Sequence, residues 1–271
     1  IRFILAGSVL YGILRLRGAP SPQRREWLGA AIVGTLLLIG GNGGVIVAEQ
    51  WVASGLAALG VATMPIWAAL FAGLWGRWPG WLEWLGLLLG FGGVVLLSFE
   101  GDLRANPVGA MMLVFAAMSW AFGSVWSHQL VMPKGLMASA AQMLVAGALF
   151  VLLGLLWGER LTTLPGLRPL LALVYLIIFG ALVAFSAYTF LLRRVRPALA
   201  TSYAYVNPVV AVVLGVSLAG EHITGFAIGA MLIILASVGL LALGKERAAR
   251  PASAAPATLP QAKKQPYADT R

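Results

Sequence analysis

The sequence predicts an all-α integral membrane protein built from two inverted five-helix repeats, and three observations support this prediction. First, 60% of the 271 residues are hydrophobic and only 10% are charged, whereas a soluble domain carries about 25% charged residues. Second, the apolar residues gather in segments long enough to cross a bilayer. Third, the first half of the chain is echoed in the second half. Most of the surface is therefore expected to face lipid.

Nine apolar segments are predicted to be membrane-spanning helices, because a span needs about 20 mostly apolar residues. They are 1–16, 27–48, 54–75, 81–98, 107–129, 136–157, 168–192, 198–219 and 223–243. Prolines fall in or beside most connections between them, where they end helices at little cost. The remaining residues, 244–271, are rich in Ala, Pro and Lys and show no apolar period. We expect them to form a disordered basic tail.

Basic residues are divided unequally between the two ends of the predicted helices. One set of alternate connections, together with the tail, holds 15 of the 19 Lys and Arg residues. The opposite set holds Arg2, Arg104, Arg160 and Arg168. Since cytoplasmic loops carry the excess of Lys and Arg, the first set and the C-terminus are predicted to be cytoplasmic.

The echo within the chain indicates a duplication. Residues 56–97 match residues 199–240 at a constant offset of 143, and Pro65 falls on Pro208. Duplicated membrane units with Pro-interrupted helices in corresponding positions are typical of secondary transporters.

Nearer the start of the chain the offset is 140, and Gly7 falls on Gly147 and Gly18 on Gly158. Matched helices run in opposite directions under the charge-based orientation, so the units are predicted to be inverted. The span 107–129 has no partner in the first unit, which predicts ten spans in the intact protein and a first helix missing from this chain. The expected units are 1–98 and 107–243, followed by the tail 244–271.

Three stretches of sequence resemble a known family. They are Gly41-Asn42-Gly43 with Ala48-Glu49, the run 119–124 (SWAFGS), and the run 197–211 (PALATSYAYVNPVVA). They resemble the EamA branch of the drug/metabolite transporter superfamily. The resemblance implies an inner-membrane exporter of amino-acid-like metabolites or amphipathic drugs, with a central cavity that the absent first helix would help to line.

Composition excludes several classes of function. The chain has no Cys, so it has no disulfides, thiolate metal sites or Cys nucleophiles. The net charge of +10 lies in loops and the tail and not on one helix face, so we expect no nucleic-acid partner. There is no Gly-Lys-Ser/Thr loop to bind ATP, no metal site and no cofactor motif. We expect a monomer that binds a small-molecule substrate and the lipid bilayer.

Asn42 and Glu49 are the first candidate site residues. Asn42 lies in Gly-Gly-Asn-Gly-Gly, where glycines allow close backbone approach and the amide offers both donor and acceptor. The alternative is a hydrogen bond that holds two helices together. Glu49 ends its span on the outer side and is the best-placed carboxylate for proton coupling, with a solvated loop acid as the alternative.

Pro65 and Pro208 are predicted to interrupt two matched helices in mid-membrane. Each removes a backbone hydrogen bond and frees a carbonyl one turn earlier. We expect them to act as paired hinges whose freed carbonyls contribute to the substrate site. A plain kink satisfied by a neighbouring hydroxyl is the alternative.

Polar residues crowd the cytoplasmic half of the 198–219 span. Tyr203 and Asn207 share one face, and Ser202 and Tyr205 share another. We select Ser202, Tyr205 and Asn207 as substrate-binding candidates, while membrane-interface anchoring is the alternative for Tyr203.

Trp120 and Tyr188 belong to two polar-aromatic clusters on the 107–129 and 168–192 spans. Trp120 is expected in mid-membrane, unlike the tryptophans that flank the spans, so it is a candidate for a cavity wall. Core packing is the alternative for both residues.

These features together predict a secondary transporter that exports small metabolites or drugs by alternating access between the two units. A lipid or lipid-linked-sugar flippase on the same scaffold is the first alternative. An intramembrane enzyme is a remote one, because acid-base or nucleophilic chemistry needs grouped His, acid, Ser or Cys residues.

Overall fold

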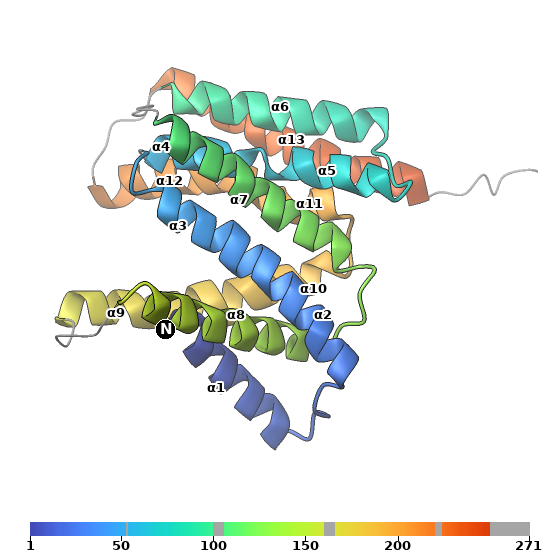
Figure 1. Cartoon of the computed structure of the whole chain (residues 1–271). Coiled ribbons are helices and arrows are strands. Elements are labelled where there is room, and N and C mark those ends of the chain that lie inside the picture. The colour runs from blue at the N-terminus through green and yellow to red at the C-terminus, as the bar shows by residue number, and fades with distance from the viewer. Residues whose placement is uncertain (53, 100–105, 160–165, 220–223, 250–271) are drawn as a thin grey trace, which may run out of the picture.

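The computed structural model describes residues 1–52, 54–99, 106–159, 166–219 and 224–249, and within these ranges the chain is helical with no strand. Figure 1 shows the helices lying across one another in a layered bundle. In order they are α1 (Arg2–Leu16), α2 (Arg24–Gly34), η1 (Thr35–Gly43), α3 (Gly44–Ala48), α4 (Ser54–Ala62), α5 (Met64–Leu74), α6 (Trp81–Ser98), α7 (Pro107–Trp126), α8 (Leu136–Leu156), α9 (Leu167–Tyr175), η2 (Leu176–Phe185), α10 (Ser186–Leu192), α11 (Pro197–Thr201), α12 (Tyr203–Ala219) and α13 (Gly225–Ala249).

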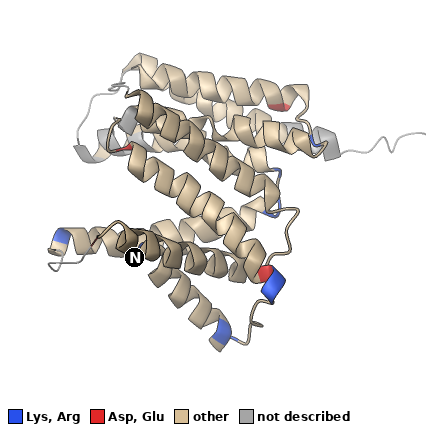
Figure 2. Cartoon of the chain, viewed as in Figure 1, with Lys and Arg blue, Asp and Glu red and all other residues tan. Residues whose placement is uncertain are grey.

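Each of the nine predicted spans corresponds to one helix or to a run of successive helices, which confirms the all-α membrane fold. Over their described residues, seven of these nine spans are long and apolar enough to cross a bilayer. Charged side chains gather at the helix ends and leave the middle of the bundle uncharged along most of its length (Figure 2). We call the end that carries Arg15, Arg24, Arg77 and Arg193 the basic end.

Four spans are interrupted, and the interruptions are of two kinds. The π-helical segments η1 and η2 widen the second span of the chain and the span that begins at α9. Thr63 separates α4 from α5, and Ser202 separates α11 from α12. Such interruptions release or weaken backbone hydrogen bonds within a membrane helix. They are therefore tolerated only where neighbouring protein groups or a water-filled cavity can satisfy the freed backbone groups.

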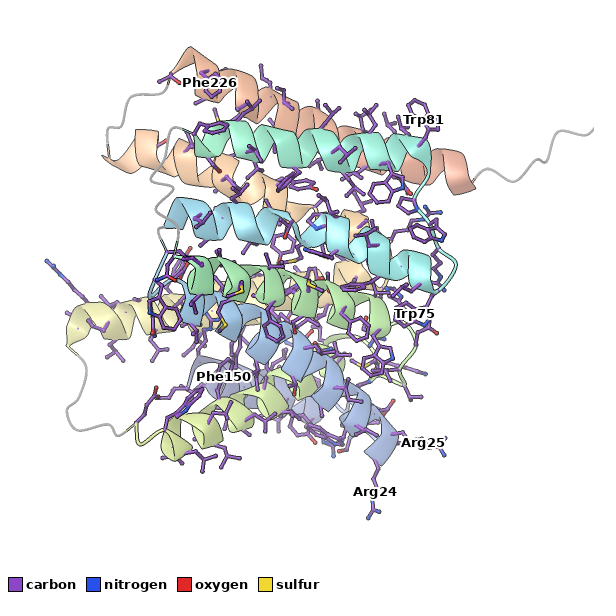
Figure 3. The ribbon with its side chains drawn as sticks, turned by 45° about the horizontal axis from the view of Figure 1, so that its top comes forward. Arg24, Arg25, Trp75, Trp81, Phe150 and Phe226 are labelled. Carbon is purple, nitrogen blue, oxygen red and sulfur yellow. The ribbon has the colours of Figure 1, made fainter. Side chains whose placement is uncertain are left out.

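α6 and α13 pack along their length. Trp81 at the start of α6 lies at the opposite end of the pair from Phe226 near the start of α13, so the helices are antiparallel (Figure 3). A Cβ at Gly90 would lie 2.6 Å from Ser237 Oγ, and one at Gly93 would lie 2.7 Å from Ile234. Glycines spaced four apart, Gly86 and Gly90 on α6 and Gly225 and Gly229 on α13, predict that these two helices pack together, and the structure confirms the packing.

The glycines of α13 do not contribute to that contact. The sequence assigned the packing to Gly86 and Gly90 on α6 and to Gly225 and Gly229 on α13. A Cβ at either Gly225 or Gly229 would meet nothing within 4 Å. The contact is made on the α13 side by larger residues such as Ser237, so that part of the prediction was wrong.

α1 and α8 form a second antiparallel pair with reciprocal contacts. A Cβ at Gly7 would lie 2.7 Å from the backbone nitrogen of Leu144, and one at Gly147 would lie 2.3 Å from that of Ile4. Under the offset of 140, Gly7 corresponds to Gly147 and Ile4 to Leu144. Each helix therefore makes the same contact with the other, as a two-fold relation between inverted copies requires.

The matched glycines Gly18 and Gly158 end these two helices. Gly18 has φ 83° and Gly158 has φ 79°, the left-handed conformation that glycine adopts without steric cost. The residue after each glycine donates its backbone N–H to the carbonyl five residues earlier. These hydrogen bonds run from Ala19 to Leu14 at 3.0 Å and from Glu159 to Gly154 at 2.9 Å. The sequence echo at these positions thus reflects a shared helix stop.

The predicted helix interruption is present at one of the two prolines only. Pro65 is buried at the start of α5, directly after the break at Thr63. Pro208 lies inside the continuous helix α12, and the break in that span is at Ser202. The two prolines therefore do not form matching interruptions.

Two predicted boundaries also differ. The span predicted to end at 129 ends at Trp126, so His128 lies in the following turn. The predicted tail 244–271 begins too early, because α13 continues to Ala249. The tail prediction for 250–271 lies outside the described residues.

Candidate functional site

A central cavity lies between the two halves of the chain and has two adjoining lobes of about 460 Å³ and 360 Å³. Both volumes fall within the range of small-molecule sites, about 300–1,000 Å³. Arg2, Asn42, Trp120 and Tyr203 line both lobes. All four interrupted spans contribute lining residues, two spans from each half, and α1 and α7 add theirs.

Asn42 is positioned by the π-helical segment η1 and by its close packing against α7. A Cβ at Gly40 would lie 2.0 Å from Ser119 Oγ, and one at Gly41 would lie 2.7 Å from the Trp120 ring. Ser119 Oγ donates a 2.8 Å hydrogen bond to the Leu36 carbonyl within η1. The hydroxyl supplies a partner for a carbonyl of the widened turn, while the glycines leave room for α7.

Arg2 places a positive charge in the largely uncharged lining of the cavity. Its Nη2 donates a 2.7 Å hydrogen bond to Asn42 Oδ1, and its guanidinium carbon lies 4.3 Å from the centre of the Phe3 ring. Because Arg2 lines both lobes of the cavity, its guanidinium can bind a carboxylate or another anionic group there.

An aromatic wall continues from Arg2 and Asn42 into the larger lobe. The Trp120 and Tyr188 ring centres are 5.4 Å apart, and Tyr203 meets Tyr188 edge to face at 5.5 Å. Tyr188 is held in place by a 2.5 Å hydrogen bond between its hydroxyl and Ser124 Oγ. Such a wall offers apolar area and ring faces to an amphipathic solute.

Glu49 and Asn207 line the smaller lobe, at the end away from the basic end. Both side chains are exposed. This lobe therefore combines a carboxylate and an amide with the guanidinium of Arg2.

The structure brings five of the predicted site residues to the cavity: Asn42, Glu49, Trp120, Tyr188 and Asn207. Pro65 and Pro208 neighbour lining residues but do not themselves line either lobe. Ser202 is buried and donates to the Leu199 carbonyl of its own span at 2.8 Å.

Tyr205 lies on the other side of its helix from the cavity. Its ring is fully buried against Gly90, and its hydroxyl donates to the Leu87 carbonyl of α6 at 3.0 Å. Tyr203 and Asn207 form the face that lines the cavity. The sequence selected Ser202, Tyr205 and Asn207, and two of these three residues, Ser202 and Tyr205, do not line the cavity.

Arg2 and Tyr203 are the cavity residues that the sequence-based selection missed. Arg2 was counted among the outer loop charges, although an arginine side chain is long enough to reach from a helix end toward the middle of the bundle. Tyr203 was recognised as sharing a face with Asn207, but it was left out of the selected residues because a tyrosine there could also anchor the helix at the membrane interface. Its spacing of four from Asn207 was the signal that would have placed it correctly.

Nothing in the described ranges gathers three His, Asp or Glu side chains as a metal site would need. The cavity offers one guanidinium, one carboxylate, two amides and aromatic rings. This set can bind a solute by hydrogen bonds, charge and stacking.

Comparison with known proteins extends this picture. The chain is 46% identical to the uncharacterized inner membrane transporter YedA of Escherichia coli K12 over 246 residues, which cover 90% of this chain and 80% of YedA. The uncharacterized transporter YvbV of Bacillus subtilis is 23% identical and covers 71% of this chain, with 64% of its own length matched.

A solved crystal structure shares the fold, with a TM-score of 0.73 and 22% identity over 89% of this chain and 85% of the other. The pattern of the EamA-like transporter family matches residues 1–99 and 107–243. The YedA relationship and the apolar helices support an integral inner-membrane protein. This chain is a membrane transporter that belongs to the EamA-like transporter family.

Proposed function

We propose that this transporter exports small metabolites or drugs by secondary transport, and that the central cavity is its substrate site. The observation that supports this most is the lining of the cavity by the four interrupted spans, two from each half. Interrupted helices at the interface between inverted repeats are the usual place for substrate sites in secondary transporters.

The same arrangement supports alternating access. The two repeats, proposed to be 1–98 and 107–243, meet around the cavity, and α1 packs on α8 as α6 packs on α13. Rocking of one repeat against the other about these pairs would open the cavity to each side in turn. In the proposed orientation the basic end and the C-terminus are cytoplasmic.

The chemistry of the lining favours a solute with a carboxylate and an apolar or aromatic part. Arg2 and Asn42 would bind the carboxylate, and Trp120, Tyr188 and Tyr203 would contact the apolar part. Glu49 would either hold a solute ammonium group or couple transport to protons. Amino-acid-like metabolites and amphipathic drugs meet this description.

The transport assay uses full-length protein in liposomes with a panel of amino acids and hydrophobic drugs. We expect uptake of at least one class, and impaired uptake by Asn42→Ala and Asn207→Ala at unchanged protein yield. Normal uptake by both variants would exclude this site. Recovery of the solute in chemically altered form would favour an enzyme, and movement of a labelled phospholipid in place of the solutes would favour a flippase.

Coupling is tested by counterflow with and without a proton gradient. A gradient should change net uptake by the natural protein but not by Glu49→Gln if Glu49 carries the proton. An equal response of both proteins would assign Glu49 to solute binding alone.

A further inference from the structure

A second pocket, of about 340 Å³, lies at the basic end and is separate from the central cavity. It forms where α5 and α10 end and where α6 and α11 begin. We call it the basic pocket. The charged and titratable residues that line it are Arg77, Glu83, His128, Arg193, Arg194 and Arg196.

Positive charge in the basic pocket exceeds negative charge. Glu83 is the one acid among the described residues that line it. Its carboxylate accepts hydrogen bonds from Arg196 Nη1 at 2.7 Å and 2.8 Å and from the Gly80 amide at 3.0 Å. Glu83 is thus occupied by Arg196 and by the start of α6, and three other guanidinium groups lack a carboxylate within the lining.

Two of the remaining guanidinium groups, those of Arg193 and Arg194, are held in place by groups that carry no charge. Arg193 Nη2 donates to the Pro133 carbonyl at 2.7 Å, and the Arg194 guanidinium lies 4.3 Å from the centre of the Phe190 ring. A carbonyl and an aromatic face fix the position of an arginine but leave its charge available to an anion.

Exposed tryptophans place the basic pocket at headgroup depth. Trp75, Trp78 and Trp81 flank it in sequence and are 37%, 58% and 72% exposed. Figure 3 shows Trp75 and Trp81 at the same end of the molecule as Arg24 and Arg25. Because exposed Trp side chains lie at the level of the lipid headgroups, the arginines of the pocket lie at the depth of lipid phosphates.

We propose that the basic pocket binds the phosphate group of an anionic phospholipid. Arg77, Arg193 and Arg194 supply N–H donors, and the small side chains of the lining leave space for the headgroup. Basic pockets between membrane helices are known to hold anionic headgroups. The basic pocket shares no lining residue with the central cavity, and binding of a lipid there goes beyond the proposed transport function.

His128 reports the electrostatics of the pocket. Partial burial lowers the pKa of its imidazole, and the positive charges of Arg77 and Arg193 lower that pKa further. A bound phosphate would offset those charges and raise the pKa.

The first experiment measures lipid retention by native mass spectrometry. The natural protein, Arg77→Gln and the control Arg25→Gln are prepared in phosphatidylcholine with and without phosphatidylglycerol. Arg25 is exposed at the same end of the molecule but does not line the pocket. We expect about fivefold weaker retention of phosphatidylglycerol by Arg77→Gln and unchanged retention by Arg25→Gln. Equal retention by all three would overturn the proposal.

The second experiment separates a lipid from a free anion. The chain contains only two His residues, so His222→Gln leaves His128 as the single imidazole for an NMR titration. Phosphatidylglycerol should raise the pKa of His128 in phosphatidylcholine nanodiscs, and inorganic phosphate should not. A shift produced equally by inorganic phosphate, or no shift with the lipid, would contradict a headgroup site.

Discussion

Arg2 and Asn42 are joined at the wall of the central cavity by a 2.7 Å hydrogen bond from the guanidinium Nη2 to the amide Oδ1. The two residues come from different spans, α1 and η1, and both line the two lobes. The amide orients the guanidinium, whose other donors have no hydrogen-bond partner among the residues that the structure describes. Under the proposed function, the charge of Arg2 would favour solutes that carry a carboxylate.

Removal of the Arg2 charge should weaken binding of solutes that carry a carboxylate. A hydrogen bond to a charged group contributes about 1.5–3 kcal/mol, so Arg2→Ala should raise the Kd of such a solute about 10- to 100-fold. The Kd is measured by quenching of tryptophan fluorescence. Arg168→Ala, which removes an exposed arginine at the start of α9, should bind as the natural protein does. Equal affinities for both variants would remove Arg2 from the site.

The two tyrosines of α12 should have separable effects. Tyr203→Ala removes a ring of the cavity wall and should raise the solute Kd about tenfold. Tyr205→Phe removes the hydroxyl that donates to Leu87 and should cost about 0.5–1.5 kcal/mol of unfolding free energy with an unchanged Kd. Fluorescence titration and thermal unfolding in detergent measure the two quantities. A change of Kd in Tyr205→Phe would mean that the cavity extends to the α6 side.

The α1–α8 contact should not accept a larger side chain. A Cβ at Gly147 would lie 2.3 Å from a backbone nitrogen, which cannot rotate away, so Gly147→Ala should destabilise the protein by about 1–3 kcal/mol. Gly229→Ala is the matched control, because its Cβ would meet nothing within 4 Å. The control should be neutral or stabilising in thermal unfolding. A tolerated Gly147→Ala would show that the two helices are further apart than described.

The imidazole of His128 should be neutral at pH 7. Its pKa lies below the ordinary value because of partial burial and the charges of Arg77 and Arg193. Arg77→Ala removes one positive neighbour, which makes protonation easier, so the pKa should rise. NMR titration of His222→Gln, with and without Arg77→Ala, measures the difference. A fall in the pKa of His128 would contradict the contribution that we assign to the charge of Arg77.

The sequence predicts the number and position of the spans well because long apolar runs and helix stops are local signals. Gly18 and Gly158 end their helices as matched stops, and Gly86 and Gly90 indicate the close packing of α6 on α13. The family resemblance was confirmed by the match to the EamA-like transporter pattern.

Other features depend on information that residue type and spacing do not carry. Within the π-helical segment η1, the Leu36 carbonyl accepts a hydrogen bond from Ser119 of α7, a contact between residues far apart in sequence. Both faces of α12 are polar, so only packing against α6 separates Tyr205 from Tyr203. The break at Ser202 has no proline to mark it, whereas Pro208 marks a place where the helix continues.

Solute protection of a cavity cysteine tests the central claim most directly. The natural chain has no Cys, so Asn207→Cys introduces a single thiol in the cavity lining, and Val210→Cys introduces one on an exposed position of the same helix outside the lining. A charged, water-soluble thiol reagent should label Asn207→Cys in liposomes, and a transported solute should slow that reaction. Val210→Cys should react slowly and without any effect of the solute. Labelling of Asn207→Cys that is absent, or that no transported solute slows, would contradict a substrate site between the two halves.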